Sequence, residues 1–587
     1  MNFTKIFNQK KIILAFVIFL GLFFRLHELG QTPKEYYWDE MAMMVDVRSI
    51  VETGFDMHGD SWLQPIFPSY SDYKAPVFIW FASASSLIFG TTGWSLRFVS
   101  VLAWVITLSC GFLLIHYLPE ENKQRKINLQ LSFALVLGFI PWSFHFSRVG
   151  FEAFLSQALL VASMTAGILA FRKKKLSSNT LLLILSSVFL GSLSSYTYFG
   201  TRYVWPILFL LEMIIFGIMP RFSKKEIKNL LKVLLVTIVS LGLFSLALRP
   251  LIDSPYYEIS QRYRLSTKSI VGFQERLNNV YKSNSWKETA GNTFFDRIIF
   301  HRQEFFVHDF LENVSDHISI DFLFLSGDSN LRHGTGRHGL LLLSLFPALI
   351  AGLVLIFTRN FKVWTFLLLW FLVALIPASV PEETPHALRS LNGLMPLAIF
   401  VSYGLAYWPK RLRLQKIYLG IVVINIVLYL NYYFTQYSQS SFVSWQGEYP
   451  SIVKVIQHNR LKGEKVLIDF PDQKLFLWFL NDGDYRAPEI QAFEFDNFQL
   501  DNFDGIIFSN WQPREIREIS NYSLLFIPKG EVSQTESEAV AQLKLRRKLK
   551  ESGMLESMED FKIPLGIEKL ENIEVNGAEY ALVRPYY

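Results

Sequence analysis

The stretch Lys10–Glu40 reads KKIILAFVIFLGLFFRLHELGQTPKEYYWDE, and the interpretation of the whole chain begins from it. Two lysines precede an apolar run over Ile12–Phe24, and no small-residue cleavage site follows that run. The run therefore predicts an uncleaved first transmembrane helix over about 11–28 rather than a signal peptide. The adjacent carboxylates Asp39 and Glu40 come next, among aromatic residues. Because carboxylates at the end of a membrane helix are costly, they indicate a candidate active site at the membrane surface.

The composition is that of a membrane protein. The 587 residues are 51% hydrophobic, with a mean hydropathy of +0.25, and soluble proteins of this length rarely reach such values. The net charge is +6, and the excess lies mostly in short loops, where it indicates membrane topology rather than nucleic-acid binding. The single cysteine, Cys110, lies in a hydrophobic run, which excludes an internal disulfide and is typical of a small core residue.

Hydrophobic runs long enough to cross a membrane recur along the chain. The predicted spans are about 11–28, 96–118, 129–147, 152–171, 180–197, 203–219, 229–248, 339–357, 363–380, 392–408 and 414–434. Basic clusters such as Arg172–Lys175 fall in alternate loops between them. Because Lys and Arg accumulate in cytoplasmic loops, this alternation predicts an all-α, multi-pass protein of the cell membrane with about 11 spans and a cytoplasmic N-terminus.

Residues 76–90 (PVFIWFASASSLIFG) are hydrophobic but short, and counting them as a span would break the alternation of charge. We therefore expect a juxtamembrane or re-entrant helix on the outer face. The first outer loop is then 28–95, and a second long outer loop covers 249–338. The unusual polar residues all fall in outer segments, so function is expected on the outer side.

The sequence changes character after about residue 440. The predicted strands are Lys465–Phe470, Gly505–Phe508 and Ser523–Ile527, and the predicted helices are 450–459 and 535–551. We therefore expect a transmembrane module over 1–435 and a small extracytoplasmic α/β domain over 436–587. This second domain carries no phosphate-binding loop or metal motif, so a docking or stabilising role is expected for it.

In the first outer loop, Asp39 and Glu40 are joined by Lys74, just before Pro76. A carboxylate and a lysine at one interface suit a reaction on a phosphate-bearing lipid. The carboxylate takes a proton from an acceptor hydroxyl, and the lysine neutralises charge on the departing phosphate. The alternative is an interfacial loop whose charges are merely solvated.

Two turns on the outer side carry further polar candidates. Arg148 and Glu152 lie at a tight turn between spans, where they either form a structural ion pair or face the same cavity as Asp39. Tyr198 lies in the aromatic turn Ser195–Tyr203, for which packing in an interfacial aromatic belt is the favoured interpretation.

Two later outer loops add cations and histidines. Arg332 lies in Gly327–Gly339, a loop rich in Gly, His and Arg that can hold a phosphate or a sugar. Its two histidines also allow a metal site, although their spacing is nonspecific. His386 and Arg389 lie in a short loop before a later span, where Arg389 either pairs with a phosphate or anchors to lipid headgroups.

In this order, these residues resemble the lipid-carrier-dependent glycosyltransferases of the C superfamily, in particular protein O-mannosyltransferases and the aminoarabinose transferases that modify lipid A. The resemblance covers most of 10–410. The matching elements are the first helix with Asp39-Glu40, Lys74-Ala75-Pro76, Phe89-Gly90, Trp94-Ser95-Leu96-Arg97, Ser147-Arg148 followed by Glu152, Tyr196-Thr197-Tyr198 and His386-Ala387-Leu388-Arg389.

The resemblance implies a mechanism and partners. A polyprenyl-phosphate-linked (or diphosphate-linked) sugar would be the donor, and a hydroxyl of a protein, lipid or glycan would be the acceptor, with inversion at the anomeric carbon. Asp39 would activate the acceptor with Glu40 beside it, and Lys74 and Arg389 would hold the carrier phosphate. Glu152 would take the place of an acidic residue that is linked in some members to a divalent metal ion.

Two other classes remain open from the sequence. A transporter or flippase of a lipid-linked envelope precursor would carry its polar groups nearer the middle of the membrane and often shows repeated halves. A non-catalytic scaffold for envelope assembly would leave the Asp39 and Lys74 pattern unexplained. A membrane-bound hexosyl- or pentosyltransferase, with membrane lipids around it, is the favoured interpretation.

Overall fold

The computed structural model describes most of the chain up to residue 447 and selected strands beyond it. The described residues are 3–69, 72–116, 123–173, 177–220, 227–266, 269–381, 383–407, 412–447, 458, 466–468, 524–528, 566–575 and 578–586. The chain divides into two units. The first comprises Met1–Lys34 and Asp46–Ser441, and the second comprises Glu35–Val45 and Phe442–Tyr587.

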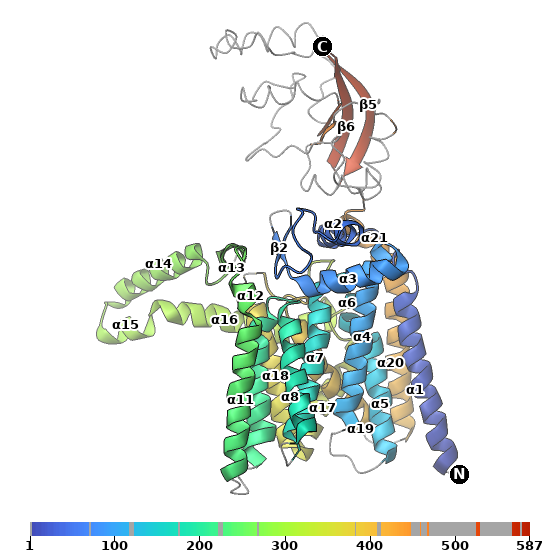
Figure 1. Ribbon diagram of the computed structural model, residues 1–587, viewed down its shortest axis with the longest axis vertical. Helices are drawn as coiled ribbons and strands as arrows, with labels where there is room; N and C mark the ends of the chain where they lie inside the picture. The colour runs from blue at the N-terminus through green and yellow to red at the C-terminus, as the bar shows by residue number, and fades with distance from the viewer. Residues whose placement is uncertain are drawn as a thin grey trace. The chain divides into compact units, whose positions relative to one another are not determined.

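Long apolar helices dominate the first unit and run side by side as a bundle (Figure 1). Among the described residues, seven helical stretches are long and apolar enough to cross a membrane. They are α4 (Gly93–His116), α7 (Glu152–Phe171), α8 (Ser178–Ser195), α9 (Thr201–Glu212) continued by η1 (Met213–Ile218), α11 (Ile227–Ala247) with α12 (Arg249–Ile252), α18 (Phe361–Ser379), and α20 (Leu412–Tyr432) with η5 (Tyr433–Tyr437) and α21 (Ser438–Ser440). The protein is therefore a multi-pass membrane protein.

The remaining predicted spans are also helical. They correspond to α1 (Phe3–Leu26), α5 (Lys123–Phe139) with α6 (Pro141–Phe146), α17 (Phe346–Arg359) and α19 (Leu394–Tyr407). Each predicted span thus coincides with a helix, although α17 and α19 belong to shorter apolar helices.

Burial distinguishes the centre of the bundle from its periphery. In α7, 83% of the apolar window is buried, whereas the window at Asn229–Ile252 is only 22% buried and presents its apolar side chains outward, as a lipid-facing helix does. Glycines allow α17 and α19 to approach closely. A Cβ on Gly352 would overlap the carbonyl of Phe400, and one on Gly404 would overlap the carbonyl of Ala348.

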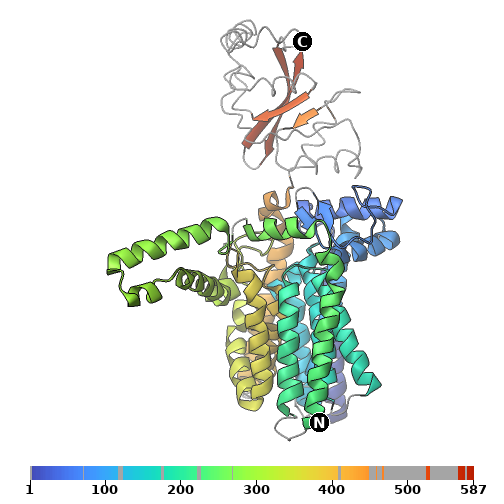
Figure 2. The same ribbon diagram turned by 60° about the vertical axis from the view of Figure 1, so that its left-hand side comes forward.

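Several short helices lie at one end of the bundle. Helix α3 (Pro76–Phe89) runs across that end rather than along the bundle, as Figures 1 and 2 show. Its Ser85 hydroxyl donates to the Ser95 carbonyl at 2.8 Å, which fixes the corner between α3 and α4. The expectation that 76–90 forms a helix that does not run along the bundle is therefore confirmed, and its position on the outer face stays a prediction.

The long loop 249–338 is also helical. It contains α12, α13 (Tyr257–Ser266), α14 (Phe273–Ala290), α15 (Phe294–Ile299), α16 (Arg302–Ile318), and η2 (Asp321–Leu325). In both views α14, α15 and α16 form a hairpin that projects sideways from the bundle (Figure 2). The side chains of Phe294 and Phe295 at its tip are 72% and 70% exposed, so the tip is an apolar surface.

The second unit contains a four-stranded sheet in the order β3-β4-β6-β5. Strands β3 (Val466–Ile468) and β4 (Leu524–Pro528) pair in parallel, and β6 (Ala578–Tyr586) pairs antiparallel with both β4 and β5 (Gly566–Val575). Two of the predicted strands are thus present. The predicted strand at Gly505–Phe508 and the predicted helices at 450–459 and 535–551 lie outside the described residues, apart from residue 458.

Candidate functional site

Buried arginines hold the C-terminal end of α1 in place. Arg148 is fully buried and donates to backbone carbonyls of Phe24, Arg25, Glu28 and Thr32. The last carbonyls of a helix lack partners within the helix, so a cation there both hydrogen-bonds them and complements the helix dipole. Arg148 is not among the residues that line the cleft described below.

Arg97 makes the same kind of contact with backbone carbonyls in the segment that follows α1. It is fully buried and donates to the carbonyls of Leu29 and Pro33 at 3.3 and 3.0 Å. The two arginines together order the chain that leaves α1. The partners that the sequence offered for Arg148 were Glu152 or a substrate, whereas the structure surrounds its guanidinium with peptide carbonyls.

A short hairpin positions Lys74. Strand β1 (Phe67–Ser69) pairs antiparallel with β2 (Asp72–Lys74), which places Lys74 opposite Phe67. Pro76 then begins α3, where its missing N–H and fixed φ suit the first helical turn. The side chain of Lys74 is 7% exposed, and its Nζ donates to Asp72 Oδ2 at 2.8 Å.

Lys74 faces a cleft of about 350 Å³, including the part open to solvent. Three of the residues predicted from separate segments meet there: Lys74, Glu152 and Tyr198. Glu152 comes from the first turn of α7, and Tyr198 from the turn between α8 and α9. The cleft therefore combines a buried cation, a carboxylate and a phenol at the end of the helix bundle.

Arg202 is a second cation in this cleft, and the sequence analysis did not select it. Its Nε donates to the Ser195 carbonyl at 3.1 Å, and its guanidinium lies 5.2 Å from the centre of the Phe199 ring. The aromatic turn was interpreted as an interfacial belt, and that interpretation assigned no role to its one arginine. The arginine itself was the available signal, because Arg is the side chain that best matches phosphate geometry.

Asp46 is a second residue that the sequence analysis missed. It lies in α2 (Trp38–Thr53), is fully buried, and accepts a hydrogen bond from the Met57 amide at 3.3 Å. Burial raises the pKa of Asp46 to about 8, with Asp56 adding to the rise and Lys74 opposing it. Lys74 is thus electrostatically coupled to a carboxyl group that stays protonated at neutral pH.

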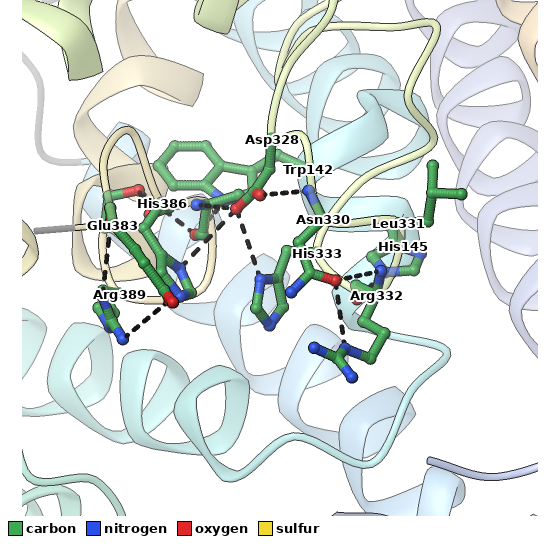
Figure 3. A network of polar contacts seen from close by, with 12 residues as sticks. Trp142, His145, Asp328, Asn330, Leu331, Arg332, His333, Glu383, His386 and Arg389 are labelled. Carbon is green, nitrogen blue, oxygen red and sulfur yellow. Dashed lines mark hydrogen bonds and ion pairs between the residues drawn. The ribbon is translucent and has the colours of Figure 1, made fainter. Parts of the chain in front are cut away.

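The loops 327–339 and 381–391 meet in a second polar cluster, the loop cluster, which is drawn in Figure 3. Asp328 lies between His333 and His386, with its Oδ2 at 3.5 Å from His333 Nδ1 and 3.8 Å from His386 Nδ1. Its carboxylate also accepts from the amides of Ala387 and Asn330 at 2.8 and 2.9 Å. These contacts tie the two loops together.

The protonation of this cluster follows from burial and neighbouring charges. Burial holds the pKa of His386 well below its ordinary value, and the neighbouring His333 and Arg389 side chains push that pKa the same way, so the imidazole is neutral. Burial alone would raise the pKa of Asp328. The neighbouring His333 side chain and the hydrogen bonds from the Ala387 and Asn330 amides outweigh burial and lower that pKa, so the carboxyl is ionised.

The predicted residues Arg332 and Arg389 flank this cluster (Figure 3). The Arg332 carbonyl lies 2.8 Å from His145 Nε2. The Arg332 side chain donates from its Nε to Asn330 Oδ1 at 3.1 Å. Arg389 lies 3.8 Å from the Glu383 carboxylate and is partly exposed. His386 and both arginines therefore share one cluster, whereas Lys74, Glu152 and Tyr198 share the cleft.

Asp39 and Glu40 begin α2, in a segment that belongs to the second unit. Within that unit, Glu40 is fully buried and its Oε2 accepts from the Tyr37 amide at 3.3 Å. Glu40 thus has a local structural contact. The catalytic role of Asp39 stays a prediction.

Two groups of three potential metal ligands occur among the described residues. They are Asp328, His333 and His386, which are buried, and His308, Asp309 and Glu312 on the surface of α16. Glu152, the residue that the resemblance linked to a metal, belongs to neither group. A metal ion held by Glu152 stays a prediction.

No protein-family model matches the chain, and no curated protein matches it at a significant level. Solved structures do match. ArnT from Cupriavidus metallidurans, bound to undecaprenyl phosphate, aligns with a TM-score of 0.51 at 9% identity over 97% of each chain. The archaeal oligosaccharyltransferase AglB from Archaeoglobus fulgidus, in complex with an inhibitory peptide and a dolichol-phosphate, aligns with a TM-score of 0.50 at 13% identity. That match covers 88% of this chain and 69% of AglB.

At such identities the likeness concerns the fold. A second AglB structure from the same archaeon, in complex with zinc and sulfate, matches with a TM-score of 0.50 at 12% identity, over 88% of this chain and 67% of AglB. The chain therefore shares the fold of ArnT and AglB.

Proposed function

We propose that this protein is a membrane glycosyltransferase that moves a sugar from a polyprenyl-phosphate or polyprenyl-diphosphate donor to an acceptor hydroxyl, with inversion. The observation that carries the proposal is the cleft, where Lys74, Arg202, Glu152 and Tyr198 converge at the end of the helix bundle. A fold shared with structures that hold undecaprenyl phosphate and dolichol-phosphate supports this use of the cleft.

The two cations suit a phosphate leaving group. Displacement of a sugar from a lipid phosphate leaves negative charge on phosphate oxygens, and fixed cations that are stronger partners for that charge in the transition state accelerate the step. Lys74 is held by Asp72 and Arg202 by the Ser195 carbonyl, so neither has to be reorganised much before reaction. Arg389 and Arg332 provide further cations in the loop cluster.

The acceptor hydroxyl needs a base in the same step. We assign this role to Asp39, with Glu40 in positioning, because a carboxylate that takes the acceptor proton makes the oxygen a better nucleophile. In the cleft, Glu152 and Tyr198 offer hydrogen-bonding groups for sugar hydroxyls.

The topology we propose has eleven spans, with the N-terminus in the cytoplasm and the cleft and the residues after 436 on the outer side. Nucleotide sugars are not available there, which gives a flipped lipid-linked sugar its purpose as donor. The apolar surface of the spans would accommodate the isoprenoid chain. A reporter fused near residue 92 should therefore be detected outside.

The decisive experiment compares envelope glycans and glycoproteins by mass spectrometry in cells with and without the protein. Deletion should remove one sugar from an envelope product, and the wild-type protein should restore it. Asp39→Asn and the pair Lys74→Gln/Arg202→Gln should insert normally but fail to restore it. Lys282→Gln, on the exposed face of α14, is the matched charge-removal control and should restore it fully. Full restoration by both site variants would refute the proposal.

A further inference from the structure

Asp328, His333 and His386 form a buried group of three potential metal ligands. One oxygen and two nitrogens, all of them potential ligand atoms, lie within 4.8 Å of one another. They come from two different loops and converge on the Asp328 carboxylate (Figure 3). We propose that these three residues bind a divalent transition-metal ion, with Zn²⁺ as the ion that the donor set favours.

Two imidazole nitrogens face Asp328 Oδ2 without forming a hydrogen bond to it. His333 Nδ1 and His386 Nδ1 are buried, and neither has a hydrogen-bond partner among the described residues. Their separations from Asp328 Oδ2, 3.5 and 3.8 Å, are too long for good hydrogen bonds. Buried polar atoms are normally paired, so two adjacent exceptions that point at one carboxylate call for a common partner.

The same separations suit ligands of a single ion. Two ligands about 2.0–2.2 Å from a tetrahedral ion lie roughly 3.3–3.5 Å apart. The pair His333 and Asp328 meets that spacing as it stands, and His386 would need to shift by only a few tenths of an ångström. Three protein ligands leave a fourth position for water or for an oxygen of a bound molecule.

The surroundings orient the ligands as they do in metal sites. The Asp328 carboxylate is fixed by two backbone amides, those of Ala387 and Asn330. The His386 backbone amide donates to His317 Nε2 at 3.0 Å, and the Ala387 carbonyl accepts from the Trp142 indole at 2.9 Å. The contacts to Asp328 orient a ligand side chain directly, and the other two fix the backbone next to and at His386; outer contacts of the first kind contribute to affinity in metal sites.

Aromatic packing fixes the second imidazole. The His333 ring lies 4.5 Å from the His386 ring and 5.6 Å from the Phe151 ring, measured between centres, and it stacks on Phe146 at 6.5 Å. These ring contacts hold the His333 imidazole in place, with its Nδ1 at 3.5 Å from Asp328 Oδ2.

The donor types select the ion. Two imidazoles and one carboxylate suit Zn²⁺ and its neighbours in the transition series, whereas Mg²⁺ and Ca²⁺ prefer oxygen ligands. A bound ion would cross-link the loops 327–339 and 381–391. This proposal concerns the loop cluster alone and stands or falls independently of the transferase activity.

The test uses the full-length protein purified in detergent and stripped with a chelator. Zn²⁺ is added back, bound metal is measured per chain by mass spectrometry, and thermal unfolding is followed by tryptophan fluorescence. We expect about one tightly held Zn²⁺ per chain, with a rise in the unfolding temperature that Mg²⁺ does not reproduce. Co²⁺ in its place should give the visible absorption of a tetrahedral site.

His386→Ala and His333→Gln should each weaken Zn²⁺ binding more than about 100-fold, because even contacts behind the ligands are worth roughly 10–100-fold. His333→Gln keeps the proposal testable if His386→Ala does not fold. His308→Ala is the matched control, since it removes a histidine from the exposed group on α16. It should leave the tight site intact. Unchanged Zn²⁺ binding in His333→Gln, or loss of the tight site in His308→Ala, would overturn the proposal.

Discussion

Lys74 donates from its Nζ to Asp72 Oδ2 at 2.8 Å, within the same β-hairpin, so the ammonium is fixed at the wall of the cleft. Lys74→Gln keeps much of the side chain and removes the charge. Since a hydrogen bond to a charged group is worth about 1.5–3 kcal/mol, undecaprenyl-phosphate binding should weaken roughly 10–100-fold. Titration of the purified protein with undecaprenyl phosphate, followed by thermal shift, measures this.

Asp72→Asn is the companion to that variant. It keeps the lysine but loosens its position, so we expect a smaller loss of lipid-phosphate binding than in Lys74→Gln. Equal binding by wild type and Lys74→Gln would remove Lys74 from the phosphate site. Binding that improves in Asp72→Asn would show that the ion pair competes with the phosphate.

Asp46 predicts a pH dependence of stability. Burial raises its folded-state pKa to about 8, against an ordinary value of 3.8. Between these values the folded protein keeps a proton that the unfolded chain has lost, so the contribution of Asp46 to stability is fully present below about pH 4 and is lost as the pH rises through about 8. Asp46→Asn, which is neutral throughout, should flatten the decrease in unfolding temperature between about pH 5 and 8. Parallel pH profiles for the two proteins would show that Asp46 is already ionised at neutral pH in the fold.

The membrane helices could be predicted from the sequence because their signal is local. The length of an apolar run can be read directly from the sequence. The positive charge of the adjacent loops then predicts on which side of the membrane each loop lies. The same count predicted that 76–90 does not cross the membrane, and its placement on the outer face stays a prediction. What periodicity could not give was the partner of each polar residue, because those partners lie far away in sequence.

Arg148 illustrates the limit. Its carbonyl partners at Arg25 and Thr32 are 123 and 116 residues away in the chain. No residue pattern indicates that a backbone carbonyl near a helix end needs a hydrogen-bond donor. The burial of Asp46 was not predicted for a related reason, since a single carboxylate among apolar residues gives no sign of whether it is buried. In the cluster of Figure 3, the sequence pointed to the histidines of both loops. It did not point to Asp328, which lies in the same loop as His333 and whose carboxylate faces both His333 and His386.

Arg148 yields a stability prediction. Arg148→Ala would leave several carbonyls at the end of α1 without donors, and we expect a loss of about 3–5 kcal/mol in the free energy of unfolding. Arg148→Lys should recover part of this, since an ammonium has fewer donors and a different shape. The control Arg249→Ala removes an exposed arginine that pairs with Asp253 at 3.2 Å, and it should change stability by at most about 1 kcal/mol. Denaturant titration in detergent measures all three. Equal losses in Arg148→Ala and Arg249→Ala would show that the contacts of Arg148 with the end of α1 contribute little to the free energy of unfolding.

Glu212 and Gly167 provide a test of packing inside the bundle. Glu212 is fully buried on α9, and neither of its carboxylate oxygens has a hydrogen-bond partner among the described residues. A Cβ on Gly167 of α7 would overlap Glu212 Oε1, so the glycine makes the space that the carboxyl occupies. Gly167→Ala should therefore cost about 1–3 kcal/mol of unfolding free energy.

The same overlap predicts that the two positions are coupled. In Glu212→Ala the carboxyl is absent, so adding Gly167→Ala should then cost close to nothing, and the double-mutant cycle should show an interaction of about 1–3 kcal/mol. Glu212→Leu replaces an unpaired buried polar group with an apolar one, so it should raise the free energy of unfolding when position 167 keeps its glycine. If Gly167→Ala costs the same with and without Glu212, the glycine is required for another reason, such as the approach of the helix backbones. The cycle thus distinguishes a glycine that accommodates one side chain from a glycine that sets the spacing of two helices.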